Sequence, residues 1–61
     1  MNSFIDVQKL LKSFGVFVYL GDRDSDILLM EEEVKELYKN NLISTDEFQK
    51  ALLILRTEKK S

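Results

Sequence analysis

The sequence predicts an all-α fold, a three-helix bundle in which an extended apolar segment at about residues 15–22 joins the first two helices. Apolar residues recur at helical spacing in three stretches of the 61-residue chain, and capping residues precede each stretch. The chain has no proline to interrupt a helix. Its only two glycines, Gly15 and Gly21, bracket a run that favours an extended backbone. A chain of this length is expected to form one domain, spanning residues 1–61.

The first helix is predicted from about Phe4 to Phe14. Ser3 is a suitable N-cap before it, and Asp6, three residues later, completes a capping box. Gly15 suits the left-handed residue that often ends a helix. Apolar residues spaced by three and four positions form one stripe along this stretch: Phe4, Val7, Leu11 and Phe14.

The extended segment contains the run Val16-Phe17-Val18-Tyr19-Leu20. This run is rich in β-branched and aromatic residues, which favour an extended backbone over a helix. A single strand has no sheet to join in a helical chain. Its apolar surface therefore either covers the helical core or contacts another molecule, and the sequence leaves both interpretations open.

The second helix is predicted from Arg23 or Asp24 to Asn40, with Asp22 or Asp24 as its N-cap. Acidic residues in the first turn suit the positive end of the helix dipole. The apolar stripe of this helix consists of Ile27, Met30, Val34, Leu37 and Tyr38.

The third helix has the clearest start signal in the chain. Ser44 and Glu47 form a capping box, and Ile43 and Phe48 are placed to form a hydrophobic staple around it. The short connection from Asn40 favours an antiparallel pair of helices. The stripe of this helix consists of Phe48, Ala51, Leu52 and Leu55.

Three apolar residues lie away from these stripes, namely Leu29, Leu53 and Ile54. In one interpretation the extended segment lies over them and widens the core. In the other, Phe17 and these three residues stay exposed and form a protein interface. The second interpretation predicts association with another protein or with a second copy of the chain.

The composition argues against an enzyme, a cofactor or a metal site. Without His or Cys, the chain lacks the commonest general base, the thiol nucleophile and most transition-metal ligands. Asp22, Asp24, Asp26 and Glu33 match four positions of a calcium-binding loop. However, Ile27 stands where that loop requires Gly, so capping and dipole roles are the expected ones.

A cytoplasmic location away from membranes is expected. The N-terminus lacks the basic region and apolar core of a signal peptide. No apolar stretch approaches the roughly 18 residues that a membrane helix needs. The absence of Cys also fits a reducing compartment.

Single-stranded nucleic acid, DNA or RNA, is the alternative partner. A single strand requires cations along its backbone and aromatic faces for stacking. The chain is acidic overall, with a formal net charge of -2, so this function requires its cations to converge on one face. The candidate contacts are Lys9, Lys12, Tyr19, Arg23 and Arg56.

The order and spacing of several short motifs resemble the YqgQ-like family of small uncharacterised proteins from low-GC Gram-positive bacteria. The resemblance implies a compact three-helix fold, a cytoplasmic protein and no known enzymatic activity; single-stranded nucleic-acid binding is a suggestion made for this family. The motifs are Asp6-Val7-Gln8-Lys9-Leu10-Leu11, Tyr19-Leu20-Gly21-Asp22-Arg23, Asp26-Ile27, Glu36-Leu37-Tyr38 and Ala51-Leu52-Leu53-Ile54-Leu55-Arg56.

Overall fold

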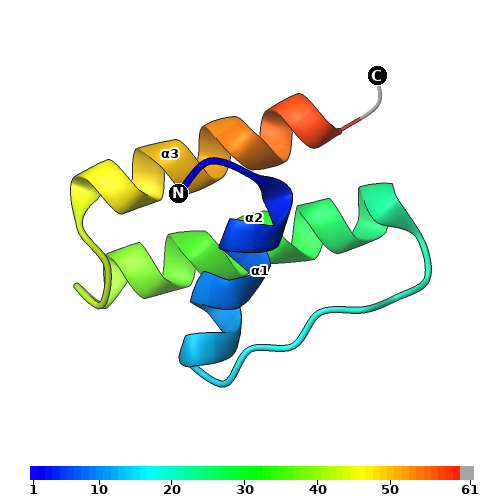
Figure 1. The fold of residues 1–61 in the computed structure, drawn as a ribbon. Helices are drawn as coiled ribbons and strands as arrows, with labels where there is room; N and C mark the ends of the chain where they lie inside the picture. The colour runs from blue at the N-terminus through cyan, green and yellow to red at the C-terminus, as the bar shows by residue number, and fades with distance from the viewer. Residues whose placement is uncertain (60–61) are drawn as a thin grey trace.

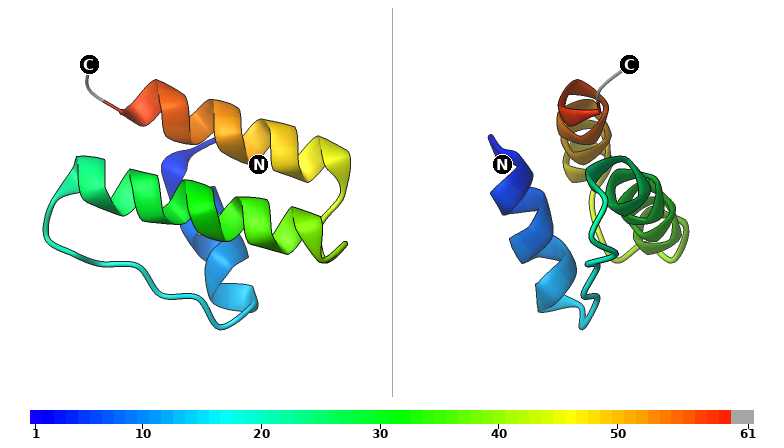
Figure 2. Two further views of the ribbon diagram at one scale, coloured as in Figure 1. Left: turned by 180° about the vertical axis from the view of Figure 1, so that it is seen from behind. Right: turned by 90° about the vertical axis from the view of Figure 1, so that its right-hand side faces the viewer.

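A computed structural model describes residues 1–59 and confirms the predicted all-α three-helix bundle. Its helices are α1 (Phe4–Ser13), α2 (Arg23–Lys39) and α3 (Thr45–Glu58). Helices α2 and α3 lie side by side and antiparallel, and α1 crosses them steeply as a second layer (Figures 1 and 2). The described residues contain no β-strand, and the long connection between α1 and α2 runs as an extended chain.

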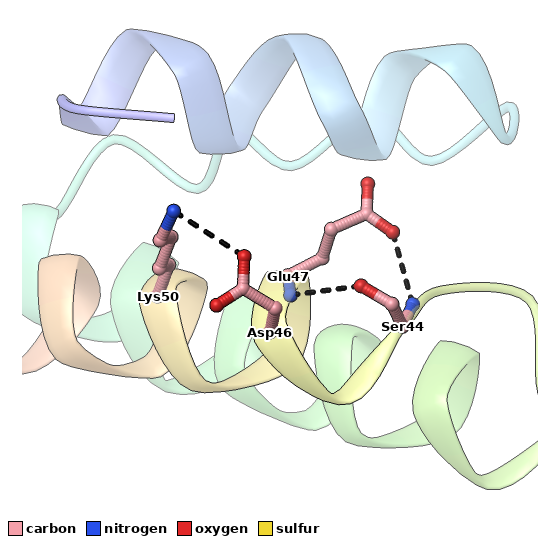
Figure 3. A network of polar contacts seen from close by, with 4 residues as sticks. All are labelled: Ser44, Asp46, Glu47 and Lys50. Carbon is pink, nitrogen blue, oxygen red and sulfur yellow. Dashed lines mark hydrogen bonds and ion pairs between the residues drawn. The ribbon is translucent and has the colours of Figure 1, made fainter.

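Side-chain caps fix where the helices begin. Ser3 and Asp6 form the predicted capping box of α1. At α3, Ser44 Oγ accepts the Glu47 N–H at 3.1 Å, and Glu47 Oε1 accepts the Ser44 N–H at 2.9 Å (Figure 3). These bonds satisfy N–H groups that have no partner within the helix. Asp22, rather than Asp24, caps α2, because its carboxylate accepts the Ser25 N–H at 2.9 Å.

A glycine ends α1 and turns the chain into the extended segment. Helix α1 ends at Ser13, one residue before the predicted Phe14. The Gly15 N–H donates to the Lys12 carbonyl and the Val16 N–H to the Leu11 carbonyl, each at 2.9 Å. Gly15 has a φ of 81°, a conformation that costs least for glycine.

The Asp22 cap makes part of the stability depend on pH. The Ser25 backbone N–H, followed by its hydroxyl, holds the pKa of the Asp22 carboxyl below its ordinary value of 3.8. A pKa that is lower in the folded chain gives stability above the unfolded pKa, which is lost as the pH falls through the folded pKa. When the pH is lowered from neutral to below 3.8, the free energy of unfolding of Asp22→Asn is therefore expected to fall less than that of the native chain. Urea denaturation at both pH values measures this difference.

Asp24→Asn is the matched control for this prediction, because Asp24 lies in the same helical turn but accepts no hydrogen bond within residues 1–59. If Asp22→Asn and Asp24→Asn lose the same stability in acid as the native chain, the cap does not have the predicted role.

The core lies where the three helices meet. One aromatic pair extends it toward the α2–α3 connection: the Tyr38 and Phe48 rings stack with their centroids 4.1 Å apart. Tyr38 remains at the surface, where its hydroxyl hydrogen-bonds the Thr45 hydroxyl at 3.1 Å. The buried apolar residues are Val7, Leu11, Ile27, Met30, Val34, Leu37, Ile43, Ala51 and Leu55. Most of the predicted stripe residues are thus in the core, but Phe14 lies beyond the end of α1 and is exposed.

Candidate interaction surface

The extended segment, residues 16–20, divides its side chains between the core and solvent. Val16 and Val18 pack against the core, and with Leu11 and Met30 they line a narrow cavity of about 20 Å³. The intervening side chains are open to solvent: Phe17 is 75% exposed and Tyr19 is 87% exposed. Over residues 16–19 this period of two is that of an extended chain with one face on the protein, whereas Leu20 is 59% exposed and does not continue it. We call Phe17 and Tyr19 the aromatic face.

Hydrogen bonds at its two ends hold the extended segment in place. The Val16 N–H is bound to the Leu11 carbonyl of α1. At the other end, the Leu20 N–H donates to Asp26 Oδ1 at 2.6 Å. Asp26 lies in the first turns of α2 and is only 9% exposed. A carboxylate is a strong acceptor, so this bond ties the segment to α2.

The sequence contains a signal for the Asp26 anchor, although sequence analysis missed it. Asp26 lies four residues before Met30, and eight before Val34, so helical spacing places its carboxyl on the apolar stripe of α2. An acidic residue on a core-facing stripe requires a hydrogen-bond partner. The partner of Asp26 is the backbone N–H of Leu20, which lies outside the helix. Motifs defined by side chains do not contain such a backbone partner.

The interpretation that the segment covers all three off-stripe residues is wrong. It runs along α1 and α2, on the side of the molecule away from α3 (Figures 1 and 2). Leu53 is 67% exposed and Leu29 is 38% exposed, whereas Ile54 is partly buried against the core. The segment does widen the core, but only through its two valines.

A second apolar site lies between the start of α1 and the end of α3. Phe4, Leu53 and Ile54 line an open groove of about 320 Å³ there. It is separate from the aromatic face, whose residues are not part of its lining. The candidate protein-interface residues therefore do not form one surface: Phe17 lies on the aromatic face, Leu53 and Ile54 line the groove, and Leu29 belongs to neither.

Arg23 makes contacts within the protein. Its Nη1 lies 2.7 Å from Glu58 Oε2, and its guanidinium carbon lies 4.4 Å from the centroid of the Phe4 ring. The ion pair joins residues 35 positions apart, so the local spacing used in sequence analysis does not show it. These contacts direct Arg23 toward the α1–α3 groove.

Lys12, another candidate cation, lies away from Arg23 along α1. Lys9, Lys12 and Arg56 are exposed. Arg23 lies over Phe4, and Lys12 is eight residues further along α1, a rise of about 12 Å along the helix axis. The geometry therefore separates Arg23 from Lys12.

Two of the four acidic residues that resemble a calcium loop have structural roles. Asp22 caps α2 and Asp26 anchors Leu20. Within residues 1–59, no three His, Cys, Asp or Glu side chains are arranged to hold a metal ion. Over the same residues, no helix is long and apolar enough to span a bilayer.

Comparison with known proteins gives similarity along the whole chain. The family model described as YqgQ-like matches residues 1–61. The chain is also 50% identical, over 58 residues, to the "Uncharacterized protein YqgQ" of Bacillus subtilis (strain 168). That alignment covers 95% of this chain and 82% of the relative.

Proposed function

The chain belongs to the YqgQ-like family, and we propose that it is a non-catalytic cytoplasmic binding module that associates with protein through its aromatic face. The observation that supports this function most directly is the exposure of Phe17 and Tyr19, at 75% and 87%, on one side of an anchored segment. Large exposed apolar side chains that lie together are typical of interaction sites. Aromatic residues are also the commonest anchors of protein interfaces.

Anchoring of the segment favours association. Val18 packs on the core, and Leu20 is bound to Asp26, so the backbone that presents both rings is already ordered. A partner therefore does not have to order this backbone on binding, a cost that otherwise reduces affinity. Full burial of one such ring contributes roughly 1.5–3 kcal/mol.

The roles of the acidic residues agree with a non-catalytic function. General acid–base catalysis by carboxylates requires a pair placed in a desolvated cleft. Asp6, Asp22, Asp26 and Glu47 instead accept backbone N–H groups, and Glu58 pairs with Arg23. These carboxylates stabilise helix ends and the extended segment.

Single-stranded nucleic acid is the second candidate partner, and the same two rings are the reason. Two exposed aromatic side chains at positions i and i+2 of an extended chain form a platform on which bases stack. Lys12 lies near the start of this segment and is exposed. The engagement of Arg23 with Glu58 and Phe4 favours protein over nucleic acid.

Photo-cross-linking in cells tests the proposed function. We expect the photoreactive analogue p-benzoylphenylalanine at position 19 to form covalent adducts with protein, because Tyr19 is 87% exposed. Adding Phe17→Asp is expected to remove most adducts by placing a charge in the apolar contact, while leaving the helical circular dichroism unchanged. The exposed Glu36 on α2 is the control position for the same analogue.

The adducts distinguish the two partners. Protein adducts at position 19 that exceed those at position 36 support the proposed function. Adducts with DNA or RNA transfer the proposal to the second candidate, and anisotropy of a labelled single strand at low and physiological salt then measures that binding. If position 19 gives no more adducts than position 36, the aromatic face is not an interaction site.

A further inference from the structure

The extended segment is attached mainly at its two ends, and we infer that it is a strap that opens and closes while the three helices stay folded. In the closed state, which the structure shows, Phe17 and Tyr19 form the aromatic face and Val18 packs on the core. In the open state the bond between Leu20 and Asp26 is broken and Val18 has left the core. Opening therefore removes the aromatic face. This regulatory consequence rests on the proposed function, whereas the opening itself does not.

Hydrogen bonds hold the segment only at its ends. The Val16 N–H is bound to the Leu11 carbonyl of α1, and the Leu20 N–H is bound to the Asp26 carboxylate of α2. Among residues 1–59, no backbone N–H or C=O group of residues 17–19 has a hydrogen-bond partner. A region with so few backbone hydrogen bonds opens at a lower cost in free energy than the helices beside it. Loss of one acceptor, the Asp26 carboxylate, thus frees the end of the segment next to α2.

The segment forms a separate layer between α1 and α2. The right-hand view of Figure 2 shows it lying between these two helices. Val16 and Val18 are only partly buried, and they line the narrow cavity together with Leu11 and Met30. Because a cavity lies beneath the valines, they make fewer contacts there than side chains in a filled core. Opening uncovers Leu11 and Met30 and leaves the direct contact between α2 and α3 in place.

The outer side of the segment is open, and a glycine lies beyond each end. Phe17 is 75% exposed, Tyr19 87% and Leu20 59%, so no helix among residues 1–59 covers this side. Gly15 and Gly21 have φ of 81° and 85°, and apart from their chain neighbours no atom lies within 4 Å of the position that a Cβ would take. Small residues at the ends of elements often absorb the dihedral changes of a hinge. The two glycines therefore allow the segment to bow outward.

Labelling of an introduced thiol tests the opening, because the native chain has no Cys. Met30→Cys places the thiol beneath the segment. Leu55→Cys is the matched control, since Leu55 is also fully buried but lies on α3 and is not part of the cavity lining. Helical circular dichroism first verifies that each variant is folded. Both are then reacted with dithiobis(nitrobenzoate) at several urea concentrations below the unfolding transition.

The labelling rate reports the population in which the thiol is uncovered, provided that the chain closes faster than the thiol reacts. We expect Met30→Cys to react faster than its global unfolding equilibrium permits. Its rate should depend little on urea, because opening of the segment exposes little surface. The rate for Leu55→Cys should instead follow global unfolding and rise steeply with urea.

Two further substitutions separate opening of the segment from unfolding of the bundle. Asp26→Ala removes a bond that is lost in both processes, so it should speed labelling of both thiols by roughly ten- to a hundredfold. Ser44→Ala removes the N-cap of α3, which stays formed while the segment is open. It should speed labelling of Leu55→Cys roughly fivefold and leave the rate for Met30→Cys unchanged.

A rate for Met30→Cys that follows global unfolding and rises with Ser44→Ala overturns the inference. If the cysteine variants do not fold, hydrogen exchange of the native chain decides. Exchange at Leu20 that is independent of low urea concentrations supports opening, whereas exchange with the urea dependence of the slowest α3 amides overturns it. Failure of the inference leaves the proposed function standing if position 19 still forms protein adducts above the control. Absence of those adducts overturns the proposed function and leaves the opening of the segment standing.

Discussion

Leu55→Ala is expected to remove about half of the free energy of unfolding of the chain. Leu55 has no exposed surface and lies in α3 at the centre of the core. Truncating a buried Leu to Ala costs about 2–5 kcal/mol, since a cavity remains. The whole domain, at about 0.05–0.15 kcal/mol per residue, has a stability of only roughly 3–9 kcal/mol. Helical circular dichroism during urea titration measures the loss.

Leu53→Ala is the matched control for this experiment, because it makes the same chemical change two residues away in the same helix. Leu53 is 67% exposed, so its truncation is expected to change the free energy of unfolding by less than about 0.5 kcal/mol. Equal destabilisation by the two variants would contradict the position of α3 in the bundle.

Asp26→Ala is expected to release the end of the extended segment and to destabilise the fold by about 1.5–3 kcal/mol, the usual contribution of a hydrogen bond to a charged group. Asp26 is the single buried acidic residue among residues 1–59, and its carboxylate binds the Leu20 N–H at 2.6 Å. Amide hydrogen exchange measures the release as faster exchange at Leu20, and urea denaturation measures the lost stability.

Asp26→Asn and Asp24→Ala separate the anchor from other effects of charge. Asparagine keeps a side-chain oxygen that accepts the same N–H, so Asp26→Asn should retain part of the protection at Leu20. Asp24→Ala removes an acidic residue from the same end of α2 without removing the anchor. If Leu20 exchanges equally fast in Asp24→Ala and Asp26→Ala, the helix dipole rather than the hydrogen bond holds the segment.

The helices were predictable because their signals are local. The Ser44–Glu47 capping box lies within four residues, and the stripes repeat at the period of the helix. The extended backbone between α1 and α2 was also predictable, from its composition and its flanking glycines. The predicted ends of α1 and α2, Phe14 and Asn40, were each one residue late, because both residues are C-caps that follow the last helical turn.

Contacts between distant residues were not predictable from those patterns. The pairing of Arg23 with Glu58 and Phe4 depends on how three helices meet, which local spacing does not contain. For the same reason, sequence analysis placed Arg23 among nucleic-acid contacts and left the exposure of Phe17 open. The structure places Arg23 beside the groove and Phe17 in solvent, which separates the two candidate surfaces.

The short connection of residues 40–44 has a consequence for the order of folding. It lets α2 and α3 meet after closure of a small loop, whereas α1 must wait for the longer segment of residues 14–22 to cross the molecule. Helices α2 and α3 also share the most extensive contact. We therefore expect the α2–α3 hairpin to form the folding nucleus and α1 to dock afterwards, within the microsecond-to-millisecond times of helical proteins with local contacts.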